Sequence, residues 1–151
     1  MVCSLYTPTN VKKYPCVIYL HCNTGNRVEA NNIIDVLLPK DIAVLSFDFA
    51  GCGNSEGEFI SLGWYEAEDL KLIVNWIKKR KKITKIGLWG RSMGAVTALL
   101  YTGLFDRDFS ALVLDSPFSC LKELALDMIS EKTGFPRLLS KPVFSYIQYR
   151  F

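Results

Sequence analysis

The sequence predicts an α/β fold in which a mostly parallel sheet carries helices on both faces. Short β-rich segments alternate along the chain with longer segments of helical periodicity, and this order is typical of parallel strands joined by crossover helices. The β-rich segments are nearly continuous in apolar residues, as expected for strands buried on both faces. With 151 residues, 50% of them apolar, residues 1–151 are expected to form a single domain.

Each expected element follows from a local pattern. Buried strands are expected over 16–21, 42–47, 84–89 and 111–114, with the remnant of another strand at Ser4–Tyr6. Helices are expected over 28–38, 64–81, 93–104, 119–132 and 137–150, the last interrupted by Pro142. The basic run 78–82 suits the carboxyl end of the second helix, and the alternative interpretation is a nuclear-localisation signal.

Composition and charge exclude several classes of protein. A net charge of +3 provides no basic field of the kind a nucleic-acid binder needs, so no nucleic-acid partner is expected. No apolar run approaches the ~20 residues needed to span a bilayer, and the first residues lack the pattern of a signal peptide. Five cysteines without a C-x-x-C spacing predict reduced thiols and a cytoplasmic location. With a single histidine, His21, neither a metal nor another cofactor is expected.

The segment Gly90-Arg91-Ser92-Met93-Gly94 has the pattern G-x-S-x-G between an expected strand and an expected helix. A strand-to-helix turn this sharp strains the backbone of Ser92 and lifts its hydroxyl above the sheet. Side chains two residues before and after the serine would collide, so Gly90 and Gly94 fill both positions. Backbone N–H groups at the start of the helix face such a site. The alternative interpretation is a glycine-rich turn with an ordinary serine.

Five segments occur in an order that matches a known family. They are "PCVIYLHCNTGNRVEA", "FDFAGCGNSEG", "SLGWYEAEDL", "IGLWGRSMGAVTALLY" and "LVLDSPFS". Together they resemble the α/β-hydrolase superfamily, in particular its serine-aminopeptidase-like and depalmitoylase-like members. The resemblance covers roughly residues 3–120. It implies a partial α/β-hydrolase fold that corresponds to the amino-terminal and central part of the domain and is truncated at both ends.

The resemblance implies roles for residues after two of the strands. Ser92 would be the nucleophile of a serine hydrolase, and the backbone N–H of Met93 would supply one donor to the oxyanion hole. The family loop that supplies the second donor typically begins His-Gly, and here the donor would be Asn23, while Cys22 replaces the glycine. His21 would have a structural role in this loop, and the alternative interpretation makes it the catalytic base.

Two aspartates follow other strands. The segment that begins at Asp48 resembles a structural loop of the family, and the alternative is a metal site formed with Glu56 and Glu58. Asp115, in the context "LDSPFS", resembles a structural hydrogen-bonding residue, and the alternative is the acid of a catalytic triad. In this fold the triad follows the chain order Ser, Asp or Glu, His. No histidine follows Ser92, so the triad acid and histidine are expected beyond residue 151.

Two hypotheses from different classes follow. The first is a serine hydrolase that transfers an acyl group from an ester, thioester or amide to water, with a small-molecule or lipid-type substrate. The second is a non-catalytic degenerate hydrolase that binds a second chain at the open edges of its sheet. A related interpretation has another polypeptide supply the missing strands. Apolar residues near the end of the chain are expected to be buried against the rest of the domain, to line a lipid-type pocket or to contact a membrane surface: Leu138, Leu139, Val143, Phe144, Tyr146 and Ile147.

Overall fold

The computed structural model describes residues 1–133. The expected helix over 137–150 and its apolar residues therefore lie outside the described part of the chain. Two compact units are present, Met1–Pro117 and Phe118–Phe151. The second unit contains the helix α4, Leu121–Thr133, which accounts for the helix expected over 119–132. A single domain over the whole chain stays a prediction.

The first unit is built on one five-stranded sheet. Its strands are β1 (Cys3–Tyr6), β2 (Tyr14–Leu20), β3 (Ala43–Phe47), β4 (Ile83–Arg91) and β5 (Ala111–Asp115). They lie in the order β1-β3-β2-β4-β5. All neighbouring pairs are parallel except β1 with β3, which is antiparallel. The expected mostly parallel sheet is therefore confirmed, and the remnant at Ser4–Tyr6 is a full edge strand.

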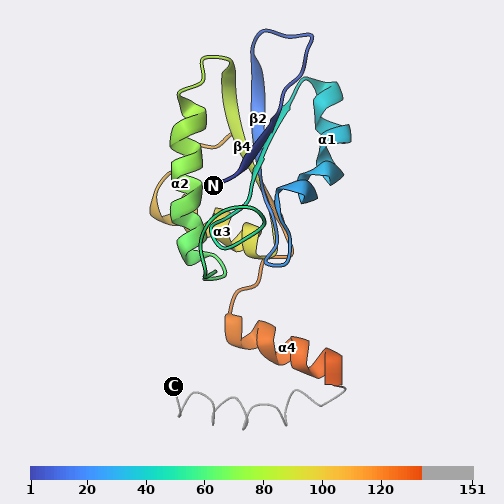
Figure 1. The fold of residues 1–151 in the computed structure, drawn as a ribbon, viewed down its shortest axis with the longest axis vertical. Helices are drawn as coiled ribbons and strands as arrows, with labels where there is room; N and C mark the ends of the chain where they lie inside the picture. The colour runs from blue at the N-terminus through green and yellow to red at the C-terminus, as the bar shows by residue number, and fades with distance from the viewer. Residues whose placement is uncertain (134–151) are drawn as a thin grey trace. The chain divides into compact units, whose positions relative to one another are not determined.

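Helices cover both faces of this sheet. The helix α1, Asn31–Leu37, and the helix α2, Trp64–Lys78, lie on opposite sides of it (Figure 1). The helix α3, Met93–Leu104, packs on the same side as α2, with which it shares a large apolar cluster that includes Phe47, Leu70 and Met93. A smaller cluster on the other side joins Tyr19, Ile33 and Val44. The two clusters explain why β2 and β3 are almost entirely apolar, with Ser46 of β3 as the exception.

Two helices differ from their expected limits. The helix expected over 28–38 starts as a 3₁₀ helix, η1 (Arg27–Ala30), and ends as another, η2 (Leu38–Lys40). The helix expected over 64–81 ends at Lys78. Bonds from Arg80 N–H to the Ile77 carbonyl and from Ile83 N–H to the Arg80 carbonyl form a turn there, both at 3.0 Å. The basic residues after Lys78 thus belong to a connection into β4, which helical periodicity alone does not reveal.

The structure bears on the state of the cysteines and on whether a helix could span a membrane. All five cysteines are free. Burial raises the pKa of the Cys16 thiol to about 12, so this side chain is a neutral core residue. Within residues 1–133, no helix has both the length and the apolar character that crossing a membrane requires. The cytoplasmic location stays a prediction.

Candidate active site

The parallel strands bring four sequence segments to the same end of the sheet. This end, at the bottom of the sheet in Figure 1, receives the residues that follow β2, β3, β4 and β5. Those residues are His21, Asp48, Ser92 and Ser116. Ligand sites of open α/β sheets form at the carboxyl ends of the strands, so these residues define the candidate site.

Ser92 has a strained backbone. It separates β4 from α3 and has φ 50° and ψ −112°, a conformation that L-residues rarely adopt. Its N–H donates to the Asp115 carbonyl at 2.8 Å, and its own carbonyl accepts from Ala95 and Val96 N–H at 3.0 and 3.1 Å. These bonds stabilise a conformation that costs about 1–3 kcal/mol in a non-glycine residue. The half-buried Ser92 side chain makes no capping bond to α3.

Gly90 and Gly94 allow the close packing around this turn. A Cβ on Gly90 would lie 2.3 Å from the Gly94 carbonyl oxygen, and a Cβ on Gly94 would lie 2.0 Å from the Leu20 carbonyl oxygen. Both obstacles are backbone atoms, which cannot move aside as a side chain can. The two glycines therefore let α3 start directly against β2 and β4.

The two expected oxyanion donors lie in neighbouring segments. Met93 is the first residue of α3, where N–H groups have no carbonyl partner within the helix. Asn23 lies in the loop after β2, inside a turn closed by a 3.0 Å bond from Gly25 N–H to the Cys22 carbonyl. Because Leu20 of β2 pairs with Gly90 of β4, this loop and the start of α3 are adjacent. Cys22 adopts no positive φ, so it replaces glycine there without left-handed backbone strain.

His21 is fully buried, and both of its ring nitrogens are engaged. Nε2 accepts from the Phe49 N–H at 3.2 Å, and Nδ1 lies 2.7 Å from the Cys22 carbonyl. These two contacts require the tautomer with the proton on Nδ1, which donates to the carbonyl. A ring held in this way has no free nitrogen to accept a proton from Ser92. The geometry favours the structural role in the loop over the alternative role of catalytic base.

The Asp115 side chain faces Arg91. Its Oδ2 lies 3.6 Å from Arg91 Nε, and its Oδ1 accepts from the Ser116 hydroxyl at 2.8 Å. The register pairs Asp115 with Arg91 across β4 and β5. None of the recorded contacts of this carboxylate reaches a histidine. These contacts agree with a structural role of Asp115. Its alternative role as a triad acid stays a prediction.

Asp48 is fully buried and forms an ion pair with Arg27. Its carboxylate accepts from Arg27 N–H at 2.6 Å, from Arg27 Nη1 at 2.5 Å and from Asn54 N–H at 2.9 Å. A Cβ on Gly53 would lie 2.4 Å from this carboxylate, and Gly53 has φ +54°, so glycine suits this position on both counts.

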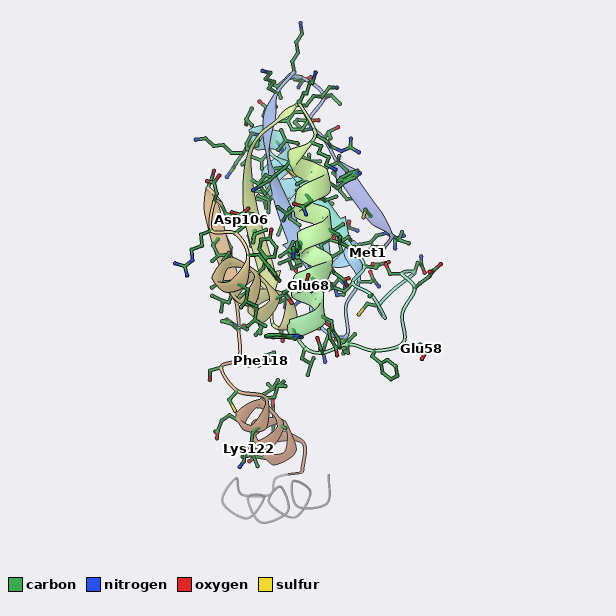
Figure 2. The ribbon with its side chains drawn as sticks, turned by 90° about the vertical axis from the view of Figure 1, so that its left-hand side faces the viewer. Met1, Glu58, Glu68, Asp106, Phe118 and Lys122 are labelled. Carbon is green, nitrogen blue, oxygen red and sulfur yellow. The ribbon has the colours of Figure 1, made fainter. Side chains whose placement is uncertain are left out.

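Glu56 and Glu58 are exposed, and Glu58 lies on the outer loop in Figure 2. No three candidate ligands for a metal gather among residues 1–133. Asp48 thus connects β3 to the start of η1.

Replacing Asp48 with asparagine is expected to lower the free energy of unfolding at pH 7 by about 3 kcal/mol, because Arg27 loses its counter-charge in a largely buried site. Burial alone would raise the pKa of Asp48, but hydrogen bonds from Asn54 and Arg27, with the Arg27 charge, hold the pKa below its ordinary value of 3.8. The stabilisation is therefore complete above that value and is lost as the pH falls through the lower pKa of the folded state.

Urea unfolding of both proteins between pH 7 and about pH 2.5 measures this effect. The difference between wild type and Asp48→Asn should shrink toward the acid end of the range. A difference that stayed constant would show that the Asp48 carboxylate contributes nothing as an ion.

The match to known proteins agrees with this arrangement. A family model described as the alpha/beta hydrolase fold matches residues 15–150. The chain belongs to the α/β-hydrolase family. The match begins within β2 and includes all four strand ends of the candidate site, so the family assignment rests on the same segments as the geometry.

Relatives within the α/β-hydrolases include enzymes that act on lipids and esters. YqkD of Bacillus subtilis (strain 168), an uncharacterised protein, is 37% identical over 109 residues, 71% of this chain and 36% of the relative. The lysophosphatidylserine lipase ABHD12 of Danio rerio is 33% identical over 125 residues, 80% of this chain and 32% of the relative. The Pyrococcus furiosus esterase Pf2001 superposes with a TM-score of 0.73 at 30% identity, over 87% of this chain and 55% of that chain. This α/β-hydrolase chain spans about a third of the length of the first two relatives.

Two polar residues of the candidate site were not identified from the sequence. Arg27 pairs with Asp48, and Glu29 contacts both the loop after β2 and Arg91. Both lie in η1, at the start of the helix that the sequence predicts over 28–38. Their partners lie 21 and 62 residues further along the chain. No local spacing links such pairs, so the sequence held no signal for them.

Proposed function

We propose that the protein is a serine hydrolase that transfers an acyl group from an ester, thioester or amide to water, with Ser92 as the nucleophile. The observation that carries this proposal is the strained backbone of Ser92, held between β4 and α3 by Gly90, Gly94 and the bond to Asp115. Strain of this kind persists where the surrounding structure maintains it, and it concentrates at functional sites. The esterase and lipase relatives favour ester substrates.

In the proposed reaction, Ser92 Oγ attacks the acyl carbonyl carbon as its proton passes to a general base. The carbonyl oxygen becomes an oxyanion that accepts hydrogen bonds from the N–H groups of Met93 and Asn23. The intermediate collapses to an acyl-serine, and the leaving alcohol, thiol or amine takes the proton from the base. Water, deprotonated by the same base, then attacks the acyl carbon of the acyl-serine. The bond from that carbon to Ser92 Oγ breaks, Oγ takes the proton back from the base, and the carboxylic acid is released.

The general base of this scheme is not His21, because both nitrogens of that ring already have partners. We assign the base and its orienting acid to sequence beyond residue 151 in the full-length protein. The matched relatives are about three times longer than the region they share with this chain, which leaves room for both residues. A cofactor has no role in the scheme.

Covalent labelling with a fluorophosphonate probe tests the proposal. The full-length protein is expected to react, and mass spectrometry should locate the adduct on the peptide that contains Ser92. A protein that folds but does not react, or reacts at another serine, would refute the assignment.

The second candidate function is that of a non-catalytic interaction module. One observation favours it, namely the exposure of β5, in which Leu112 and Val113 are 41% and 40% exposed. An exposed apolar edge strand is a site at which another chain can add a strand. This candidate predicts no labelling and a stable complex with a second polypeptide.

A further inference from the structure

One carboxylate contacts three segments that meet beside Ser92. Glu29 lies in η1, and its side chain is only 11% exposed. Its Oε1 accepts from the Tyr19 hydroxyl at 3.0 Å and from Arg91 Nη1 at 3.3 Å. Its Oε2 accepts from the Cys22 N–H at 3.1 Å. The Glu29 carboxylate therefore accepts hydrogen bonds from strand β2, from the loop after it and from the residue before Ser92.

The position of Cys22 controls the direction of the Asn23 N–H. That N–H belongs to the same peptide group as the Cys22 carbonyl, and a planar trans peptide points the two in opposite directions. The carbonyl accepts from Gly25 N–H at 3.0 Å and faces His21 Nδ1 at 2.7 Å. Glu29 holds the preceding peptide group through the Cys22 N–H. Both peptide groups that flank Cys22 are thus fixed. The one after it is held by Gly25 and His21, and the one before it is held by Glu29.

We propose that Glu29 is a positioning residue of the oxyanion hole, whose carboxylate fixes Cys22 so that the Asn23 N–H remains directed at the oxyanion that forms above Ser92. The inference rests on the proposed function and assigns the residue that preorganises one of its two donors. Glu29 contacts neither Ser92 nor the position of the acyl group, so it acts through the loop. A donor that is fixed before the reaction needs no reorganisation when charge develops, which makes it more effective than a mobile one.

The surroundings of Glu29 fit this role. A Cβ on Gly25 would lie 2.2 Å from Oε2, so glycine leaves the space that the carboxylate occupies. The Arg91 guanidinium provides a counter-charge to the nearly buried carboxylate. Arg91 is the last residue of β4 and directly precedes Ser92, so the ion pair couples the loop to the strand end that presents the serine. The three donors to this carboxylate, from Tyr19, Cys22 and Arg91, therefore balance its charge and fix its orientation.

The first test is Glu29→Ala in the full-length protein, with the rate of labelling of Ser92 measured against the concentration of a fluorophosphonate probe. The maximal rate should fall about tenfold or more, because removal of a whole oxyanion donor costs 10²–10³-fold. The concentration that gives half the maximal rate should change little, since the oxyanion interaction develops only in the transition state. Glu29→Gln retains an acceptor for the Cys22 N–H and should restore part of the rate.

A second variant displaces the carboxylate without removing it. In Gly25→Ala the new Cβ should push Oε2 away from the Cys22 N–H, and labelling should slow as it does in Glu29→Ala. The matched control is Glu68→Ala, which removes a carboxylate on the exposed surface of α2 whose recorded partner is Lys71 at 3.5 Å (Figure 2). This control should label at the wild-type rate.

The outcomes separate the two proposals. If the wild-type protein does not react, the proposed function fails and this inference fails with it. If the wild type reacts and both Glu29→Ala and Gly25→Ala react equally fast, only the role of Glu29 is refuted. The role is also refuted by a second combination of results, in which Glu29→Ala weakens probe binding as much as it slows labelling and Glu29→Gln restores none of the labelling rate. The carboxylate would then contribute to general stability and not to the oxyanion hole.

Discussion

Ser92→Ala is expected to lower the rate of ester hydrolysis by the full-length protein about 10⁴-fold or more, since the loss of a nucleophile removes the covalent route. Ser92→Gly should be equally inactive but should unfold at higher urea concentration than Ser92→Ala. The reason is the φ of 50° at this residue, which a Cβ opposes and glycine adopts freely. We expect the glycine variant to be the more stable of the two by about 1 kcal/mol, the low end of the cost of such strain.

Hydrolysis of p-nitrophenyl acetate and urea unfolding measure the two effects on the same preparations. Ser110→Ala is a matched control, because Ser110 is exposed and precedes β5 at the opposite end of the sheet. It should leave both activity and stability unchanged. Hydrolysis retained in Ser92→Ala would contradict the role of the serine. Equal stability of the alanine and glycine variants would contradict the strain.

The fold and the place of the site follow from local patterns in the sequence. Apolar runs around Ile18, Leu45 and Leu88 mark buried strands, and the polar residues after those runs mark the end of the sheet at which the candidate site lies. The pair Gly90 and Gly94 also has a local cause, since both lie within two residues of Ser92. Patterns of this kind depend on neighbouring residues alone, and for that reason they can be read before the structure is known.

The contacts that hold the site together depend on residues far apart in the chain. Glu29 reaches Arg91, and the Asp115 carbonyl accepts from Ser92 N–H. These pairs exist only because β4 lies between β2 and β5. The engaged ring of His21 is a further example, because its partner Phe49 follows a different strand. Residue type and spacing identify such side chains as polar candidates, but the sheet order decides which of them meet.

Gly94→Ala is expected to destabilise the protein by about 3 kcal/mol, near the upper end of the usual cost of overpacking a core. The new Cβ would lie 2.0 Å from the Leu20 carbonyl oxygen and 2.5 Å from its carbon. Relief of this contact requires α3 to move away from β2. Such a movement also separates Met93 from the loop that carries Asn23, so labelling of Ser92 should be lost even in the fraction that remains folded.

The same substitution elsewhere in α3 should have the opposite effect, which makes the comparison decisive. A Cβ on Gly103 would meet no atom within 4 Å, and the residue lies within the same helix. Gly103→Ala is therefore expected to stabilise the protein by about 0.5 kcal/mol, because alanine has the higher helix propensity. Urea unfolding midpoints of the two variants, measured beside wild type, should move in opposite directions. A stabilising shift in both variants would mean that helix propensity, rather than the approach of α3 to the Leu20 backbone, governs position 94.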